Sequence, residues 1–174
     1  MHILGSLTNS WVKLDRQMKD SVRTGITFGL TSAAITTLGL MVGLHSGTQS
    51  RIAVLGGILT IAIADAFSDA LGIHVSEESE NVHTNIQIWV ATGATFLAKL
   101  LFALTFAVPV LILPLSTAVL ASIIWGMSIL VILSYSMAKS QGESSWKIIG
   151  EHILIAMVVI AVSQWVGSWV STLA

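Results

Sequence analysis

The sequence predicts an all-α integral membrane protein: a bundle of five transmembrane helices preceded by an amphipathic helix at the membrane surface. Of its 174 residues, 54% are hydrophobic and only 10% are charged, which leaves too little polar surface for a soluble domain. The mean hydropathy is +0.86. The net charge of −1 gives no sign of nucleic-acid binding, and the absence of Cys excludes disulfides, thiolate metal sites and cysteine nucleophiles.

Residues 1–23 are expected to form the surface helix. Apolar side chains recur there every three or four residues, at Leu7, Trp11, Leu14, Met18 and Val22. The charged residues lie mostly on the opposite side, and Trp11 is suited to anchor such a helix at the headgroup level. We therefore separate residues 1–23 from a transmembrane domain of residues 24–174.

Apolar runs of about 20 residues, the length that crosses a bilayer, predict five spans at Thr24–Leu44, Ile52–Val75, Ile88–Leu113, Leu115–Met137 and Ile148–Thr172. The third and fourth runs together hold about 50 residues, too many for one crossing. Because Pro109 and Pro114 interrupt them, we place the reversal at Pro114.

The distribution of basic residues predicts the orientation of the bundle. Four precede the first span, namely Lys13, Arg16, Lys19 and Arg23. Lys139 and Lys147 lie between the fourth and fifth spans, whereas Arg51 stands alone after the first. The excess of positive charge on cytoplasmic loops then places the N-terminus in the cytoplasm and, with five spans, the C-terminus outside.

Small residues recur at spacings of three and four along the first span, at Gly25, Gly29, Ser32, Thr36, Gly39 and Gly43. Ser163, Gly167 and Ser171 repeat the pattern in the fifth span. Such stripes let the backbone of another helix approach closely, so we expect tight helix packing at both.

Two aspartates lie inside the second span, where ionised side chains are costly. Asp65 and Asp69 are four residues apart, which places both carboxylates on one face of a helix. Lys99 lies roughly ten residues, or about 15 Å, inside the third span, at a depth similar to that of Asp65. We expect it to pair with Asp65 in preference to Asp69, as a structural ion pair or as a counter-ion that cations displace.

Five potential metal ligands follow the second span, namely His74, Glu77, Glu78, Glu80 and His83. On a continuing helix, His74 and Glu78 lie one turn apart, where they could hold a divalent cation. Glu80 and His83 have a similar spacing. We favour an electrostatic funnel for cations, with Glu151 and His152 as neighbours, over a merely solvated helix end.

The runs FGLTSAAITTLGLMVGL and ADAFSDALGIHVSEESE, with the order of the five spans, resemble the vacuolar iron transporter family of membrane metal-ion transporters. The resemblance covers nearly the whole chain after Arg23 and is most specific in the first two spans. It implies a homodimer whose ion path runs between the first two helices of both subunits. It also implies proton-coupled export of ferrous iron or a similar divalent ion from the cytoplasm, with no enzyme activity and no resident cofactor.

This chain departs from the family pattern at the path itself. Ser32 stands where members carry an Asp, Asp69 where they carry a Met, and Ile73 where a Glu follows the Gly; Asp65 replaces a small residue. A helical cytoplasmic insertion that collects metal in some members is absent. Exchanging a thioether for a carboxylate favours oxygen-preferring ions, so manganese joins iron as a candidate. We expect Ser32, Thr36 and Lys99 to line the path.

Two other classes of function compete with transport. An intramembrane aspartyl protease needs aspartates from different helices, whereas Asp65 and Asp69 share one, so no enzyme is expected. A scaffold or sensor that does not transport would use Asp65 and Lys99 as a structural ion pair. In the preferred interpretation, a homodimer in the cell membrane has the lipid bilayer, divalent metal ions and protons as its partners.

Overall fold

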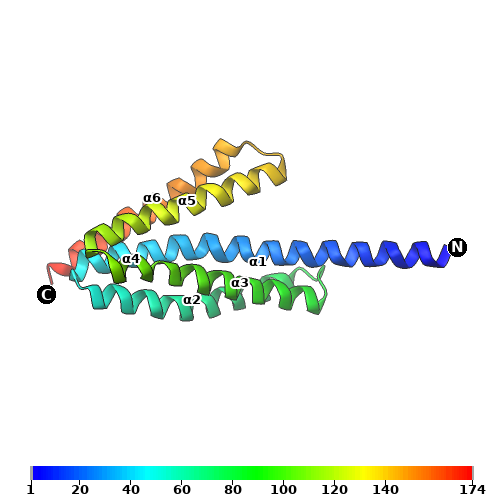
Figure 1. Cartoon of the computed structure of the whole chain (residues 1–174), viewed down its shortest axis with the longest axis horizontal. Helices are drawn as coiled ribbons and strands as arrows, with labels where there is room; N and C mark the ends of the chain where they lie inside the picture. The colour runs from blue at the N-terminus through cyan, green and yellow to red at the C-terminus, as the bar shows by residue number, and fades with distance from the viewer. Residues whose placement is uncertain (1, 174) are drawn as a thin grey trace.

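The structure, a computed structural model, describes the backbone of residues 2–173 and the side chains of residues 14–173. The described residues form helices without any strand: α1 (His2–Thr48), α2 (Arg51–Ser79), α3 (Asn85–Thr105), α4 (Ala107–Ile112), α5 (Leu115–Gln141) and α6 (Ser145–Ser171). Figure 1 shows them as a bundle with the two ends of the chain at opposite ends. The predicted all-α class is confirmed.

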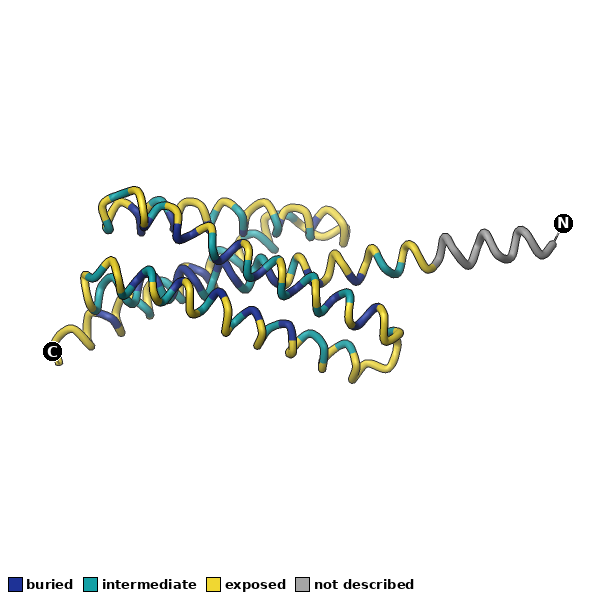
Figure 2. The backbone as a smooth tube through the Cα atoms, turned by 60° about the horizontal axis from the view of Figure 1, so that its bottom comes forward, coloured by how far each residue is buried: buried dark blue, intermediate teal, exposed yellow. Residues whose placement is uncertain are grey.

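Five segments are long and apolar enough to cross a membrane, with α3 and α4 together forming the third (Asn85–Ile112). Their bounds agree with the predicted spans to within a few residues, except that the helices extend further at the predicted cytoplasmic ends. Figure 2 shows buried residues where helices meet and exposed residues on the outer faces. Many of the exposed residues are large and apolar, such as Phe67 and Leu71 of α2, which is typical of a surface that faces lipid. The chain is a multi-pass membrane protein.

α1 is one continuous helix, and its N-terminal part extends beyond the other helices (Figure 1). No turn therefore separates the predicted surface helix of residues 1–23 from the first span. The side chains of Leu7 and Trp11 lie outside the described residues. The location of residues 1–23 at the headgroup level stays a prediction.

The two prolines produce two separate breaks. Pro109 has no N–H to donate to the carbonyl of Thr105, and the helix is interrupted at Phe106, between α3 and α4. At the second break Leu113 is extended (φ −112°, ψ 160°), as is usual before a proline, and α5 starts directly after Pro114. The predicted reversal at Pro114 is confirmed. Arg51 stabilises it by donating to the carbonyl oxygen of Leu113 (2.8 Å).

The small residues of α1 contact two different helices. Gly25 and Gly29 lie against α3, and a Cβ on Gly29 would be 2.7 Å from the carbonyl oxygen of Thr95. Gly39, Gly43 and Gly47 lie against α6, where they meet Val159, Ser163 and Gly167. The predicted close packing is confirmed for both the first and the fifth span. α1 is thus the central helix, and it also contacts α2 and α5.

Gly29→Val should destabilise the protein strongly, because its side chain would overlap the α3 backbone. Overpacking of this kind costs about 1–3 kcal/mol. Gly93→Val in α3 is the matched control, since Gly93 is exposed and a Cβ there meets nothing within 4 Å. Thermal unfolding in detergent checks this. Equal melting temperatures for the two variants would contradict the close α1–α3 contact.

The α5–α6 hairpin lies against α1 near the C-terminal end of the bundle and diverges from it toward the α5–α6 loop (Figure 1). At the closed end, Ser46 Oγ donates to the backbone carbonyl of Gln164 (3.1 Å). The wedge at the open end contains a cavity between α1, α5 and α6 that both polar and apolar side chains line.

Candidate functional site

A buried lysine joins the first three helices of the bundle. Lys99 of α3 is 1% exposed. Its Nζ donates to Ser32 Oγ of α1 (2.7 Å) and to Asp69 Oδ2 of α2, and it lies 2.5 Å from Asp65 Oδ2. An ammonium group has three N–H donors, so three oxygens surround it. Ser32, Asp65, Asp69 and Lys99 are called the Lys99 cluster below.

The packing of the helices explains why these side chains meet. Gly25 and Gly29 bring the α1 backbone against α3, which places Ser32, about one turn further along, beside Lys99. On α2, Ala62, Ala66 and Ala70 are the buried residues around the aspartates. Their small side chains let α2 approach closely enough for a carboxylate to reach Nζ. The glycines of α1 and the alanines of α2 therefore allow the close packing that brings the charged side chains together.

The expected ion pair between Lys99 and Asp65 is present, but Lys99 also pairs with Asp69 and donates a hydrogen bond to it, so the structure shows no preference for Asp65. Side chains on a helix lean toward its N-terminus. Lys99 therefore leans toward the start of α3, and in the antiparallel α2 that direction leads to Asp69. A comparison of the depths of the Cα atoms alone does not include this shift of the Lys99 ammonium group toward the start of α3.

The Lys99 cluster carries two carboxylates against one ammonium group. The Asp65 and Asp69 side chains retain 25% and 17% exposure. Lys99 contacts one oxygen of each carboxylate. Both aspartates therefore keep acceptor capacity for a proton or a cation.

The acidic segment after the second span does not continue as a helix. α2 ends at Ser79, Glu80 caps it, and Asn81 has a positive φ of 54°. This reversal brings His83 back to Glu77, with 2.8 Å between Nδ1 and Oε2. The expectation that Glu80 and His83 lie one turn apart on a continuing helix is wrong.

His74 and Glu78 lie one turn apart on α2, as expected, and His74 already has a polar partner. His74 Nδ1 is 3.1 Å from Thr92 Oγ1, and its ring lies edge-on to Trp89. Glu78 and Glu80 are exposed. Among residues 14–173, no group of three or more His, Asp or Glu side chains is arranged to hold a metal ion. Within one chain, the segment expected to form the funnel therefore consists of exposed acidic residues and the Glu77–His83 pair.

A small cavity of about 160 Å³ lies beside that pair. Asp20, Glu77, His83 and Gln87 are among its lining residues, so α1, α2, α3 and the intervening loop all contribute. Asp20 was not expected here, because its position on the polar side of α1 resembles that of any solvated charge. Asp20 lies near Glu77 because α1 packs against the end of α2, and the sequence around Asp20 does not indicate this contact.

The remaining expected site residues lie elsewhere. Thr36 Oγ1 donates to the backbone oxygen of Ser32 (2.9 Å) and lines an apolar groove of about 580 Å³ along α1 and α6. His152 is 2.7 Å from Ser134 Oγ and lines the wedge cavity, so it is not a neighbour of the acidic loop as expected. Glu151 is exposed.

No known protein family has a model that matches this chain, and no curated protein matches it either. The fold and the site define a multi-pass helical membrane protein with a buried lysine between two aspartates.

Proposed function

We propose that the protein transports divalent metal cations, iron or manganese, out of the cytoplasm in exchange for protons. The observation that carries this proposal is the Lys99 cluster, a set of ionisable groups at membrane depth on three packed helices. Such groups are costly inside a bilayer and mark ion pathways or proton relays. The resemblance of the first two spans to the vacuolar iron transporter family supports the choice of cargo.

The charges of the cluster suit exchange between a metal ion and protons. With Lys99 protonated and both aspartates ionised, one cluster has a net charge of −1. Two clusters facing one path in a dimer would have a net charge of −2, which one divalent cation neutralises. In the proposed exchange, protons replace the departing cation. The carboxylate oxygens that Lys99 does not contact are where a proton or a cation can bind first.

The outer face of α2 supports assembly as a dimer. Small residues recur every four positions on this exposed face, at Gly56, Thr60, Ala64, Ser68 and Gly72. A Cβ on Gly56 or Gly72 meets nothing within 4 Å, so this face is open to a second helix. The partial exposure of Asp65 and Asp69 fits a path completed by a second copy.

A scaffold or sensor is the second candidate. It is favoured by one observation, that Ser32, Asp65 and Asp69 already surround the Lys99 ammonium group. In that function the cluster holds three helices together, and cations have no path.

Flux in proteoliposomes tests the proposal. With the vesicle interior made acidic and the cytoplasmic face outward, Mn²⁺ or Fe²⁺ should enter the vesicles and protons should leave. Collapsing the pH gradient should stop net uptake, and Mg²⁺ and Ca²⁺ complete the ion panel. The scaffold function instead predicts no flux of any of the four ions, with or without a gradient.

Single cysteines test the orientation, since the chain has no native Cys. Glu80→Cys and Glu143→Cys should react with an impermeant maleimide from the cytoplasm, and Thr48→Cys and Thr172→Cys from outside. All four residues are exposed at helix ends or in loops. The extent of labelling is compared between intact cells and inverted vesicles. Labelling of Glu80→Cys and Thr172→Cys from the same side would contradict five crossings.

A further inference from the structure

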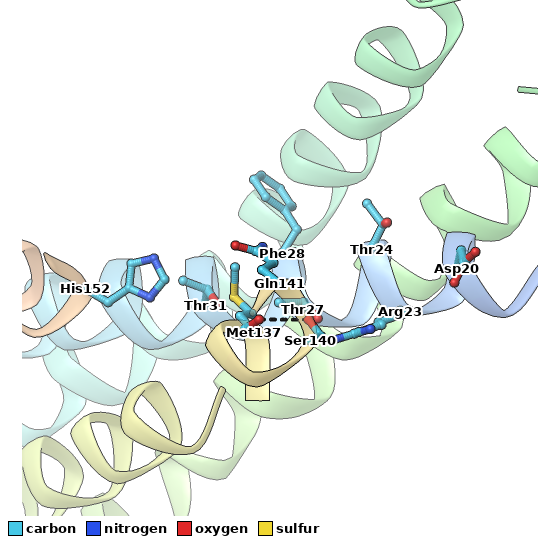
Figure 3. Close-up of a pocket in the computed structure, with 10 residues that line it drawn as sticks. All are labelled: Asp20, Arg23, Thr24, Thr27, Phe28, Thr31, Met137, Ser140, Gln141 and His152. Atoms are coloured by element: carbon cyan, nitrogen blue, oxygen red, sulfur yellow. Dashed lines mark hydrogen bonds between the residues drawn. The ribbon is translucent and has the colours of Figure 1, made fainter. Parts of the chain in front are cut away.

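The wedge between α1 and the α5–α6 hairpin encloses a cavity of about 490 Å³. It follows α1 from Asp20 to Thr31, a length of about 16 Å. The end of α5 and His152 of α6 form the opposite side (Figure 3). This cavity shares Asp20 and Thr24 with the small acidic cavity, but none of its lining residues belongs to the Lys99 cluster. Its position is at the membrane face that carries the α2–α3 and α5–α6 loops.

Hydrogen-bonding groups are concentrated in this cavity, which is unusual between membrane helices. Thr24, Thr27, Ser140 and Gln141 line it, all at the loop end. At the inner end, the buried Thr31 Oγ1 has no hydrogen-bond partner in the described chain. A buried hydroxyl group without a partner is costly and calls for a ligand or water.

His152 presents a defined ring nitrogen to the cavity. Ser134 Oγ donates to the backbone oxygen of Leu130 (2.6 Å), so it accepts from His152 Nδ1 (2.7 Å). The ring therefore carries its proton on Nδ1, and Nε2 is the nitrogen left to meet a ligand.

The charges at the mouth of the cavity favour an anion. The Arg23 guanidinium lines it and forms no hydrogen bond or ion pair with residues 14–173. Lys139 is exposed on α5 next to Ser140 and adds a second positive charge at this end. Asp20 also lines the mouth, one turn before Arg23, and it opposes an anion there. Figure 3 shows Asp20 and Arg23 at one end and His152 at the other.

We propose that this wedge binds an anionic phospholipid, with the phosphodiester at Arg23 and the hydroxylated headgroup among the threonines and Ser140. A guanidinium group is suited to bidentate phosphate recognition. Basic pockets between transmembrane helices bind anionic headgroups in this way. Phe28 and Met137 add an apolar wall for the glycerol and acyl portions. α1 and the α5–α6 hairpin diverge at this end of the bundle (Figure 1), and the proposed site does not depend on whether the protein transports cations.

Thermal stability of the delipidated protein in an uncharged detergent tests this site. Phosphatidylglycerol should raise the melting temperature in a saturable manner, because a ligand of the folded state stabilises it. Phosphatidylcholine and inorganic phosphate should have little effect. Arg23→Gln should weaken the apparent affinity for phosphatidylglycerol about tenfold. Lys19→Gln is the matched control, since Lys19 is exposed on the same helix, pairs with Asp15 and lies outside the cavity.

Asp20→Asn gives a test of opposite sign, because removing the opposing carboxylate should tighten phosphatidylglycerol binding about threefold. Tighter binding does not arise from misfolding, so this variant stays informative even if Arg23→Gln is unstable. An equal shift with phosphatidylcholine would show that the wedge does not select anions. A shift reproduced by inorganic phosphate would replace the lipid with a free anion. Wild-type affinity in both variants would also overturn the proposal.

Discussion

Asp69→Asn is expected to lower metal flux strongly while leaving the fold intact. Removing this carboxylate leaves Lys99 and Asp65 as a neutral pair, 2.5 Å apart, with Ser32 still accepting from Nζ. The cluster then no longer has the net negative charge that attracts a divalent cation. Loss of one charge-assisted ligand should lower flux at subsaturating ion by about tenfold or more.

Glu78→Gln is the matched control for this variant. It removes the same charge from the same helix, but Glu78 is exposed at the membrane surface. We expect a higher apparent KM for the ion and an unchanged maximal rate, because a surface charge acts on ion concentration. Flux and melting temperature are measured for both variants. Normal transport by a folded Asp69→Asn protein would show that the cluster is not the transport site.

The membrane architecture could be predicted because its determinants are local. Run length and hydropathy define the five spans. Pro114 marks the reversal because it cannot donate a hydrogen bond and restricts Leu113 before it. The glycines of α1 indicated close packing, but not that one set contacts α3 and the other α6. Which glycines face α3 and which face α6 depends on how the other helices are arranged around α1.

The membership of the site was predicted more reliably than its geometry. Charges at membrane depth are rare, so Asp65, Asp69 and Lys99 were recognisable from the sequence and do come together. The hydrogen bond to Asp69 depends on the tilt of a side chain on an antiparallel helix. The turn that brings His83 to Glu77 depends on Asn81, a residue type that tolerates positive φ. Asn81 was a usable signal for the end of α2.

Asp20, Ser134 and His152 illustrate what a sequence pattern leaves out. Each resembles an ordinary polar residue on its own helix. Asp20 lines two cavities, and Ser134 fixes the proton of His152 across the α5–α6 hairpin. These contacts depend on packing between different helices, which the pattern of a single helix does not contain.

Lys99→Met should destabilise the protein by about 3–5 kcal/mol, the usual cost of removing one partner of a buried ion pair. Two carboxylates would then remain close together at membrane depth. Adding Asp69→Asn should recover a large part of that loss. Adding Asp65→Asn should recover less, because Asp65 is the more exposed aspartate and its ionised carboxylate is less costly to leave unpaired. Equal recovery by the two aspartate changes would contradict this difference in exposure.

Manganese separates the transport and scaffold functions within the same set of variants. If the ammonium group is a counter-ion that cations displace, a divalent cation should take its place in Lys99→Met. Mn²⁺ should then raise the melting temperature of Lys99→Met more than that of the wild type, since binding to the folded state adds stability. The same variant should transport more slowly, because a tightly held ion is released with difficulty. Lys99→Met with Asp65→Asn and Asp69→Asn has lost both carboxylates and should show no manganese effect. If none of the folded variants is stabilised by saturating Mn²⁺ at neutral pH, the Lys99 cluster holds helices together and does not bind the cargo.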